Sequence, residues 1–149
     1  MIAVIQRVSN ASVTIDQKKH SEIGVGLLIL LGIAENDTEI DAEWICNKIP
    51  PLRIFSDEQG KMNLSLMDIG GEILLISQFT LMANATKGNR PSYISAAKPL
   101  IAIPLYNYCV EKLNKILDNK LKTGVFGADM KVSLLNDGPV TIILNSKEK

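Results

Sequence analysis

Apolar and polar positions alternate through the first part of the chain, as half-buried β-strands require. One alternating series contains Ile2, Val4 and Val8, and a second contains Ala11, Val13 and Ile15. The polar run at 16–19 that follows predicts a hairpin turn, because nothing in it would be held in a core.

The segment Gly26–Ile33 is apolar at nearly every position, so it predicts a central strand that is covered on both faces. Such a strand requires more than one packed layer. The surrounding apolar run, Val25 to Ala34, is far shorter than the ~20 residues that cross a bilayer. We therefore expect no membrane segment.

Two amphipathic helices are predicted. The first begins after Thr38, an N-cap residue with Asp41 three positions on, and ends at Pro50–Pro51. The second runs from about Pro104 to Leu117. The side chains expected to face the core are Ile40, Trp44, Ile45 and Ile49 in the first helix, and Leu105, Cys109, Leu113, Ile116 and Leu117 in the second.

Four further segments are typical of strands, and the segment Asn84–Ser92 is typical of a loop. The mixture of strands and helices predicts a mixed α/β fold with more strand than helix. The four strand segments are Leu52–Phe55, Glu72–Gln78, Asp129–Leu135 and Val140–Leu144.

Composition limits the chain to one folded domain. It has 149 residues, 46% hydrophobic and 21% charged, which suffices to bury roughly 68–70% of the unfolded surface. Cys46 and Cys109 have neither the number nor the spacing of a disulfide framework or a metal site, so a reducing cytosol fits best. The apolar start, with Arg7 as its first charge, is unlike a signal peptide.

The net charge of zero conceals an asymmetry. Residues 1–75 carry 6 basic and 11 acidic side chains, and residues 76–149 carry 10 and 5, so the halves have charges of −5 and +5. A basic half is compatible with a polyanionic partner and equally with an ordinary solvated surface. Lys87, Arg90 and Lys98 are the candidates for phosphate contacts.

A single histidine, His20, limits the chemistry that the chain can support. It lies in a polar, lysine-rich turn, so neither a Ser-His-Asp or Cys-His arrangement nor a zinc site is readily assembled. The sequence also contains no phosphate-binding G-x-x-x-x-G-K-[ST] loop and no dinucleotide fingerprint after a strand. Any catalysis must come from carboxylates, lysines, hydroxyls, backbone dipoles or the substrate itself.

Two segments are candidates for function. The first segment, Ser77-Gln78-Phe79-Thr80, places polar side chains at the end of an apolar strand. These side chains are either a functional site or an ordinary polar strand end. Asn136-Asp137-Gly138-Pro139-Val140-Thr141 places a Gly-Pro bond between two strands. This second segment is either an ordinary hairpin turn or a special loop in which proline can adopt the cis form.

Four segments, taken together, resemble the D-aminoacyl-tRNA deacylases, and the resemblance runs from end to end. Two of them are the segments just described. The others are the N-terminal strand from Met1 to Val8 and the pair Arg53–Asp57 with Gly60–Asn63. The resemblance implies a three-layer fold of sheet, sheet and helices in a single domain, residues 1–149.

The same resemblance implies a cytoplasmic, homodimeric hydrolase that needs no cofactor and no metal. Its substrate would be D-aminoacyl-tRNA, bound by the 3′-terminal adenosine and the D-amino acid, with some activity on glycyl-tRNA. Cleavage would depend on the 2′-hydroxyl of the RNA and on backbone groups, not on a protein nucleophile.

The resemblance also implies roles for particular residues. The backbone N–H groups of Phe79 and Thr80 would form an oxyanion hole, and Gly138–Pro139, in the cis form, would enter the partner subunit's site and exclude L-amino acids. The remaining implied site residues are Ser77 and Gln78 at the strand end, Phe126 and Met130 around the adenine, Arg7 beneath the Gly-Pro loop, and Thr141 as a supporting residue.

Two other classes of function remain compatible with the residues alone. One is a non-catalytic module that binds RNA or nucleotides, which the basic half of the chain would equally support. The other is an interaction protein in which the Gly-Pro segment serves only to form a dimer.

Overall fold

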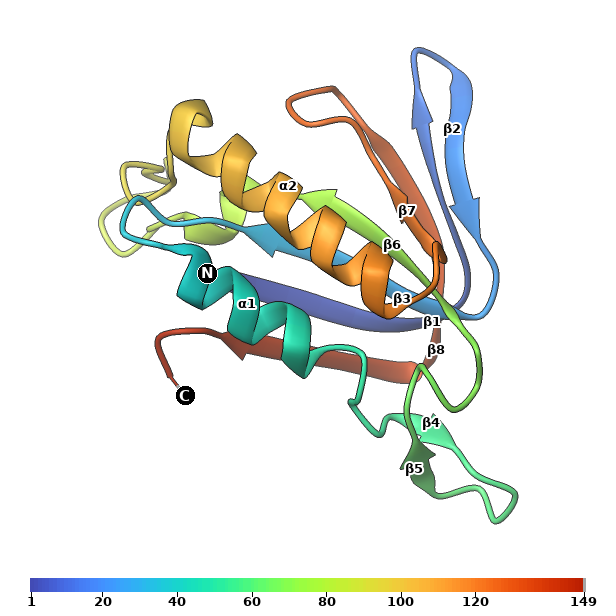
Figure 1. Ribbon diagram of the computed structural model, residues 1–149. Coiled ribbons are helices and arrows are strands. Elements are labelled where there is room, and N and C mark those ends of the chain that lie inside the picture. The colour runs from blue at the N-terminus through green and yellow to red at the C-terminus, as the bar shows by residue number, and fades with distance from the viewer. Residues whose placement is uncertain (149) are drawn as a thin grey trace.

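The two longest strands, β1 and β8, pair with each other in the computed structural model, which describes residues 1–148 (Figure 1). The first half of β1 pairs with β3 and its second half pairs with β2, while β8 runs antiparallel along almost all of β1. β6 lies parallel to β3, and β7 lies parallel to β6. The strand bounds are Ile2–Ile15 (β1), Lys18–Ile23 (β2), Gly26–Gly32 (β3), Glu72–Ser77 (β6), Leu121–Thr123 (β7) and Lys131–Asn145 (β8).

The prediction of a central strand covered on both faces is confirmed by β3. Leu27, Ile29 and Leu31 point into one core, which the helices complete. Leu28, between them, points into a second core together with Val13 of β1. Because side chains alternate across a strand, one short apolar segment serves both cores.

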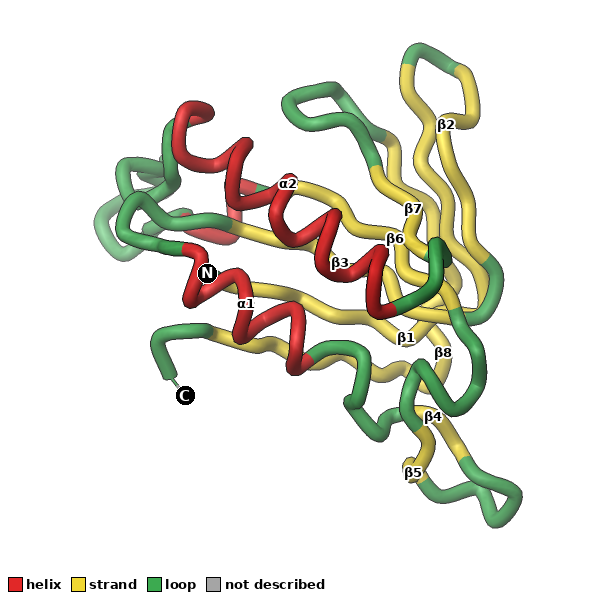
Figure 2. Tube along the Cα trace, viewed as in Figure 1, coloured by secondary structure: helices red, strands yellow, loops and turns green. Residues whose placement is uncertain are grey.

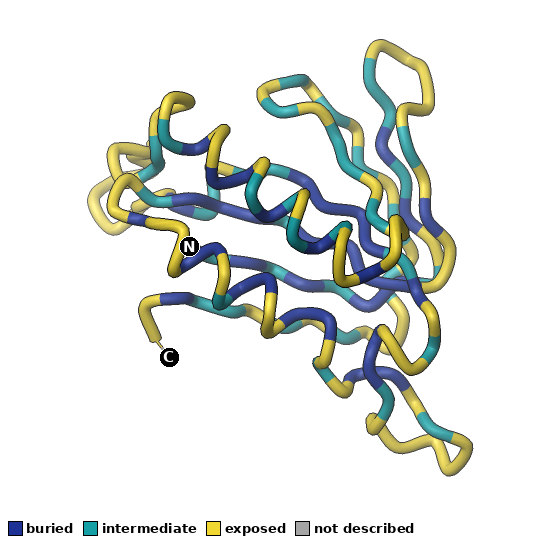
Figure 3. The backbone as a smooth tube through the Cα atoms, viewed as in Figure 1, coloured by how far each residue is buried: buried dark blue, intermediate teal, exposed yellow. Residues whose placement is uncertain are grey.

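Three layers follow from these two cores. Both helices lie on one face of β3 and β6, while the β1–β2 hairpin and the start of β8 form the layer on the other face (Figures 1 and 2). Buried and exposed residues alternate along both helices (Figure 3), and the buried ones belong to the core that the helices share with β3 and β6. The expected mixed α/β fold with a sheet, sheet and helix order is therefore confirmed.

Helix α1 (Glu39–Lys48) begins after Thr38, as predicted. The Asp41 carboxylate accepts hydrogen bonds from the backbone N–H of Thr38, at 2.9 Å, and from its hydroxyl. The prediction that Ile40 faces the core is wrong, because Ile40 is 70% exposed. The buried face passes through Ala42, Ile45 and Cys46 instead, which places Ile40 on the solvent side.

Helix α2 (Pro99–Ile116) begins five residues before the predicted start. Pro99 occupies the first helical position, where its missing N–H removes no hydrogen bond. Pro104 lies in the second turn and has no N–H for the carbonyl of Leu100, and both residues are exposed. The prediction that Ile116 faces the core is wrong, because Ile116 is 36% exposed and lies outside the core. No helix within residues 1–148 has the length and apolar character needed to cross a membrane.

The strand predictions need correction near the C-terminus. The two segments expected there, Asp129–Leu135 and Val140–Leu144, form one strand, β8, which begins at Lys131. The segment between them is not a hairpin turn. Val8 of β1 pairs with Asn136, and Gln6 pairs with Thr141, so β8 bulges by three residues at this point without reversing direction.

Shorter elements also differ from the predictions. The hairpin after β1 turns on two residues, Asp16 and Gln17. Their φ values are 48° and 62°, and a two-residue turn of type I′ requires positive φ at both positions. The predicted strand Leu52–Phe55 is replaced by β4 (Phe55–Ser56), which pairs with β5 (Met62–Leu64). We did not expect β5 or β7, because each has only three residues and no clear alternation.

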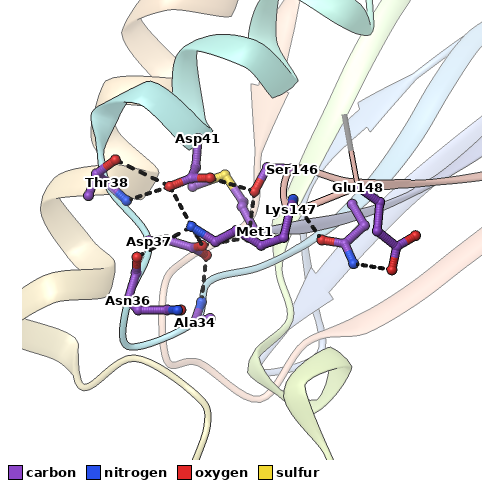
Figure 4. Close-up of polar contacts among 10 residues, drawn as sticks. Met1, Ala34, Asn36, Asp37, Thr38, Asp41, Ser146, Lys147 and Glu148 are labelled. Carbon is purple, nitrogen blue, oxygen red and sulfur yellow. Dashed lines mark hydrogen bonds and ion pairs between the residues drawn. The ribbon is translucent and has the colours of Figure 1, made fainter.

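A buried polar cluster joins the two ends of the chain (Figure 4). The α-ammonium of Met1 donates to the Asp37 carboxylate at 2.7 Å and to the Ser146 hydroxyl at 2.9 Å. Ser146 in turn donates to Asp41 at 2.8 Å, and the Lys147 ammonium lies 2.9 Å from the same carboxylate. The cluster fixes β1 and the end of β8 to the start of α1.

We expect Asp41→Asn to lower the free energy of unfolding by about 2 kcal/mol at pH 7, and by less at pH 3. Burial raises the pKa of Asp41, but hydrogen bonds from Lys147, Thr38 and Ser146 together hold it well below the ordinary value of 3.8. A lowered pKa stabilises the fold above pH 4, and this contribution is lost as the pH falls further.

Urea unfolding at both pH values measures this effect. Asp118→Asn, which changes an exposed carboxylate outside the cluster, is the control and should change little at either pH. An equal loss for Asp41→Asn at pH 7 and pH 3 would contradict the assignment.

Candidate functional site

A pocket of about 260 Å³ opens at the C-terminal end of β6. Ser77, Gln78 and Phe79 form one wall, where the strand ends. The chain between β7 and β8 forms the opposite wall, and Ala97, just before α2, and Ala102, in its first turn, also line the pocket. The lining residues from the β7–β8 connection are Phe126, Gly127, Ala128, Asp129 and Met130. Five predicted site residues therefore lie around one pocket.

The strand end is held by a backbone hydrogen bond and a close packing contact. The N–H of Gln78 donates to the carbonyl of Leu31 at 2.8 Å, and the chain then turns into the short 3₁₀ helix η1 (Phe79–Met82). This helix packs directly on Gly32, where an added Cβ would lie 2.8 Å from the Leu81 Cβ. Only glycine permits that approach.

Two backbone donors are free at the start of η1. Within residues 1–148, no acceptor pairs with the N–H groups of Phe79 and Thr80. The hydroxyl of Thr80 accepts a hydrogen bond from the side-chain amide of Gln78 at 2.5 Å. An amide is not a base, so this contact orients Thr80 and does not activate it.

The position of Phe126 depends on a residue that we did not predict. Tyr106 of α2 packs edge-to-face against the Phe126 ring, with centroids 5.9 Å apart. Its hydroxyl donates to the carbonyl of Leu75 in β6 at 2.9 Å, and burial raises the pKa of the phenol well above its ordinary value. Tyr106 thus connects the two walls. The sequence offered one signal for Tyr106, namely its position beside Leu105 on the apolar face of the helix.

The predicted Gly-Pro loop lies in the bulge of β8, and the Gly138–Pro139 peptide bond is cis. Arg7 lies beneath it, buried, with Nε 3.1 Å from the carbonyl oxygen of Asp137. Its Nη1 donates to the carbonyl of Ile54 at 2.6 Å. Asn136, to which the sequence assigned no role of its own within this segment, spans the base of the loop by donating to the carbonyls of Arg7 and Val140.

This loop does not lie beside the pocket of its own chain. Ser77 pairs with Leu31, which pairs with Ala3, whereas the loop lies between the levels of Gln6 and Val8. Strand geometry then places the loop about 13 Å along the strands and about 14 Å across them from the pocket. Thr141 is exposed on β8 beside the loop, also away from the pocket.

The remaining predicted residues lie elsewhere. His20 is exposed in β2, and Cys46 and Cys109 are buried between the two helices. Lys87, Arg90 and Lys98 are exposed on and just after the segment 84–92. Across residues 1–148, no three His, Cys, Asp or Glu side chains are grouped closely enough to hold a metal ion.

Fold and site together define a mixed α/β protein with an apolar pocket and two free backbone donors at its polar end. Backbone donors of this kind suit a carbonyl oxygen that gains negative charge, as the oxygen of an ester does during hydrolysis. The comparisons with known proteins agree. The D-Tyr-tRNA(Tyr) deacylase family model matches residues 4–145, so the chain belongs to that family.

Individual relatives show the same relationship. The chain is 60% identical to a D-aminoacyl-tRNA deacylase of Cytophaga hutchinsonii and 58% identical to one of Bacteroides thetaiotaomicron, over 100% of this chain and 99% of each relative. A solved structure of a c-Myc DNA unwinding element binding protein superimposes with a TM-score of 0.93 and 46% identity, over 97% of this chain and 98% of that one.

A more distant structure shows the fold alone. It is described as a probable eukaryotic D-amino acid tRNA deacylase and superimposes with a TM-score of 0.84 at 13% identity, over 96% of this chain and 97% of that one. The three-layer arrangement is therefore shared with a chain of very different sequence.

Proposed function

We propose that this protein is a D-aminoacyl-tRNA deacylase, which hydrolyses the ester between a D-amino acid and the 3′-terminal ribose of tRNA. The observation that carries the proposal is the pocket at the end of β6 with the free N–H groups of Phe79 and Thr80 beside it. Full-length relatives that are named for this activity support it. Residues 1–149 would act as one domain in the cytoplasm.

The chemistry needs little from the side chains. Water adds to the ester carbonyl, assisted by the ribose 2′-hydroxyl, and the carbonyl oxygen becomes an oxyanion that the two N–H groups stabilise. The bond to the ribose oxygen then breaks, releasing the D-amino acid and a tRNA with a free hydroxyl. Each preorganised donor can lower the barrier by about 3–4 kcal/mol.

The pocket suits an adenine base. Phe126 and Met130 offer an aromatic and a thioether surface across the pocket from Phe79. Ser77 and Gln78 place hydrogen-bonding groups at the strand end, where a ribose or a base edge would lie. We therefore assign the terminal adenosine to the pocket and the ester to its rim at η1.

An exposed apolar surface favours a homodimer. Val4 pairs with Leu30 on one side and with Ile143 on the other, so these side chains form a row across β3, β1 and β8. Ile143 is 67% exposed, on the sheet face opposite α1 and α2. A second copy covering this row would remove apolar surface from water.

The dimer would also complete the site. Because the loop at Gly138–Pro139 lies far from the pocket of its own chain, we assign it to the pocket of the partner. Its carbonyl oxygens would hold the α-ammonium of the substrate and leave no space for an L side chain, while a D side chain points to solvent. Glycine has no side chain, so glycyl-tRNA would also be cleaved to some extent. Arg7 and Thr141 would support the loop from beneath and beside it.

The test is the loss of D-tyrosyl-tRNA incubated with the purified protein, with and without a metal chelator. We expect rapid hydrolysis that the chelator does not change, because backbone donors and the substrate hydroxyl supply the chemistry. Hydrolysis that fails even with added divalent metal would contradict the proposed function.

Thr80→Ala should keep substantial activity, within about tenfold of the wild type, because the backbone N–H of residue 80 survives the change. The expected loss comes only from the missing contact with Gln78, which now helps to orient η1. Single-turnover hydrolysis of D-tyrosyl-tRNA measures it. A fall of 10⁴-fold or more, as when a true nucleophile is removed, would show that Thr80 attacks the ester itself.

A second candidate function is nucleic-acid binding without catalysis. The solved relative named as a DNA unwinding element binding protein, at 46% identity, favours it. This alternative predicts that the protein binds uncharged RNA or DNA but leaves D-tyrosyl-tRNA intact. The hydrolysis assay above separates the two.

A further inference from the structure

Two exposed aromatic rings lie together at the mouth of the pocket. Phe79 lines the pocket and is 58% exposed, and Tyr93 is 41% exposed. Their ring centroids are 5.2 Å apart at an interplanar angle of 68°. An edge-to-face pair leaves ring faces uncovered, so a planar group beside the pocket could stack there.

The position of Tyr93 is fixed by the backbone. Asn84 and Ser92 exchange two hydrogen bonds of 2.8 Å, which close the segment between them. The carbonyl of Tyr93 then accepts a hydrogen bond from the N–H of Ala96 at 3.0 Å. The ring therefore stands on a closed stem next to η1.

The charge of the segment that carries Tyr93 favours a polyanion. Between Glu72 and Glu111 the sequence contains three cations and no carboxylate, and the three are Lys87, Arg90 and Lys98. Two carboxylates from other segments lie nearby: Glu35 is 3.4 Å from the backbone N–H of Lys98, and Asp129 lines the pocket opposite. The segment that carries Tyr93 itself has only positive charge.

We propose that Tyr93, with Phe79, forms a stacking platform for the base of the nucleotide that precedes the terminal adenosine. This inference rests on the proposed function and extends it. Single-stranded RNA ends are commonly bound by stacking on aromatic side chains, beside cations that contact the phosphates. With the adenosine in the pocket, its 5′ neighbour must leave past the rim, where this pair lies.

The test compares two small substrates that differ by one nucleotide: D-tyrosyl adenosine, and D-tyrosyl cytidylyl-adenosine. The wild type should hydrolyse the dinucleotide with a kcat/KM at least about tenfold higher, mainly through a lower KM. In Tyr93→Leu, which keeps an apolar contact with Phe79 but has no ring, the two kcat/KM values should converge. Tyr93→Phe is the matched control and should preserve the difference.

Three outcomes would overturn the platform. These are a wild type without preference for the dinucleotide, a Tyr93→Leu variant that keeps the preference, and a Tyr93→Phe variant that loses it. If Tyr93→Leu fails to fold, the comparison of the wild type with Tyr93→Phe on both substrates still tests the preference. A wild type that cleaves neither substrate nor D-tyrosyl-tRNA would contradict the proposed function instead.

Discussion

Gly138→Ala should lower kcat/KM for D-aminoacyl-tRNA by at least about 100-fold while the chain stays folded. Gly138 has a φ of 122°, which L side chains rarely adopt. An added Cβ would lie 2.8 Å from Nη2 of Arg7 and 2.9 Å from Cγ2 of Val140. The guanidinium that holds the loop would have to move, and the loop with it.

The matched control is Gly60→Ala. Gly60 also has a positive φ, 75°, but an added Cβ there would meet nothing within 4 Å, and it lies in the turn between β4 and β5. The Gly60→Ala variant has the same kind of backbone strain but displaces no neighbouring residue, so its activity should stay near that of the wild type. Equal activity of the Gly138→Ala variant and the wild type would show that the loop at Gly138–Pro139 is not part of the site.

Ile143→Asp should produce a folded monomer with almost no deacylase activity. The substitution places a carboxylate in the apolar row with Val4 and Leu30, where a second copy would bury it unpaired. In the separate chain Ile143 is 67% exposed, and its neighbours Ile142 and Leu144 keep their core contacts, so folding should change little. Activity should be lost because, in the proposed dimer, it is the loop at Gly138–Pro139 of one chain that would complete the pocket of the other.

Light scattering and the hydrolysis assay, performed on the same preparations, measure both effects. Ile40→Asp is the control, since Ile40 is similarly exposed, at 70%, but lies on α1 on the opposite side of the sheet. It should leave both mass and activity unchanged. A monomeric Ile143→Asp variant with full activity would contradict a site shared between two chains.

Local patterns in the sequence predicted those elements that depend only on residues close to them in the chain. The apolar run of β3 showed that two layers cover it, and the capping residues of α1 showed where that helix begins. The strand end at Ser77–Thr80 was identified because polar side chains interrupt an apolar strand there. Each of these inferences needs only neighbours in the chain.

The predictions that were wrong or incomplete concern residues whose contacts lie far away in the sequence. The bulge at 137–140 resembled a hairpin turn because its alternative, a continuous β8, is stabilised by pairing with β1 more than 120 residues earlier. Ile40 looked like a core residue because it follows helical spacing from Trp44, but only the placement of the sheet shows which face is buried. The helical pattern could place Tyr106 on the apolar face of α2, but its hydrogen bond to a carbonyl of β6 depends on how the helix packs on the sheet.

The most direct test of the account is hydrolysis of D-tyrosyl-tRNA, L-tyrosyl-tRNA and glycyl-tRNA by the same preparation. We expect fast cleavage of the D-ester, slower cleavage of the glycyl ester and none of the L-ester, because in the proposed site the loop at Gly138–Pro139 would exclude an L side chain whatever its identity. Equal cleavage of the D- and L-esters would contradict this selection, and cleavage of none of the three would contradict the deacylase assignment itself.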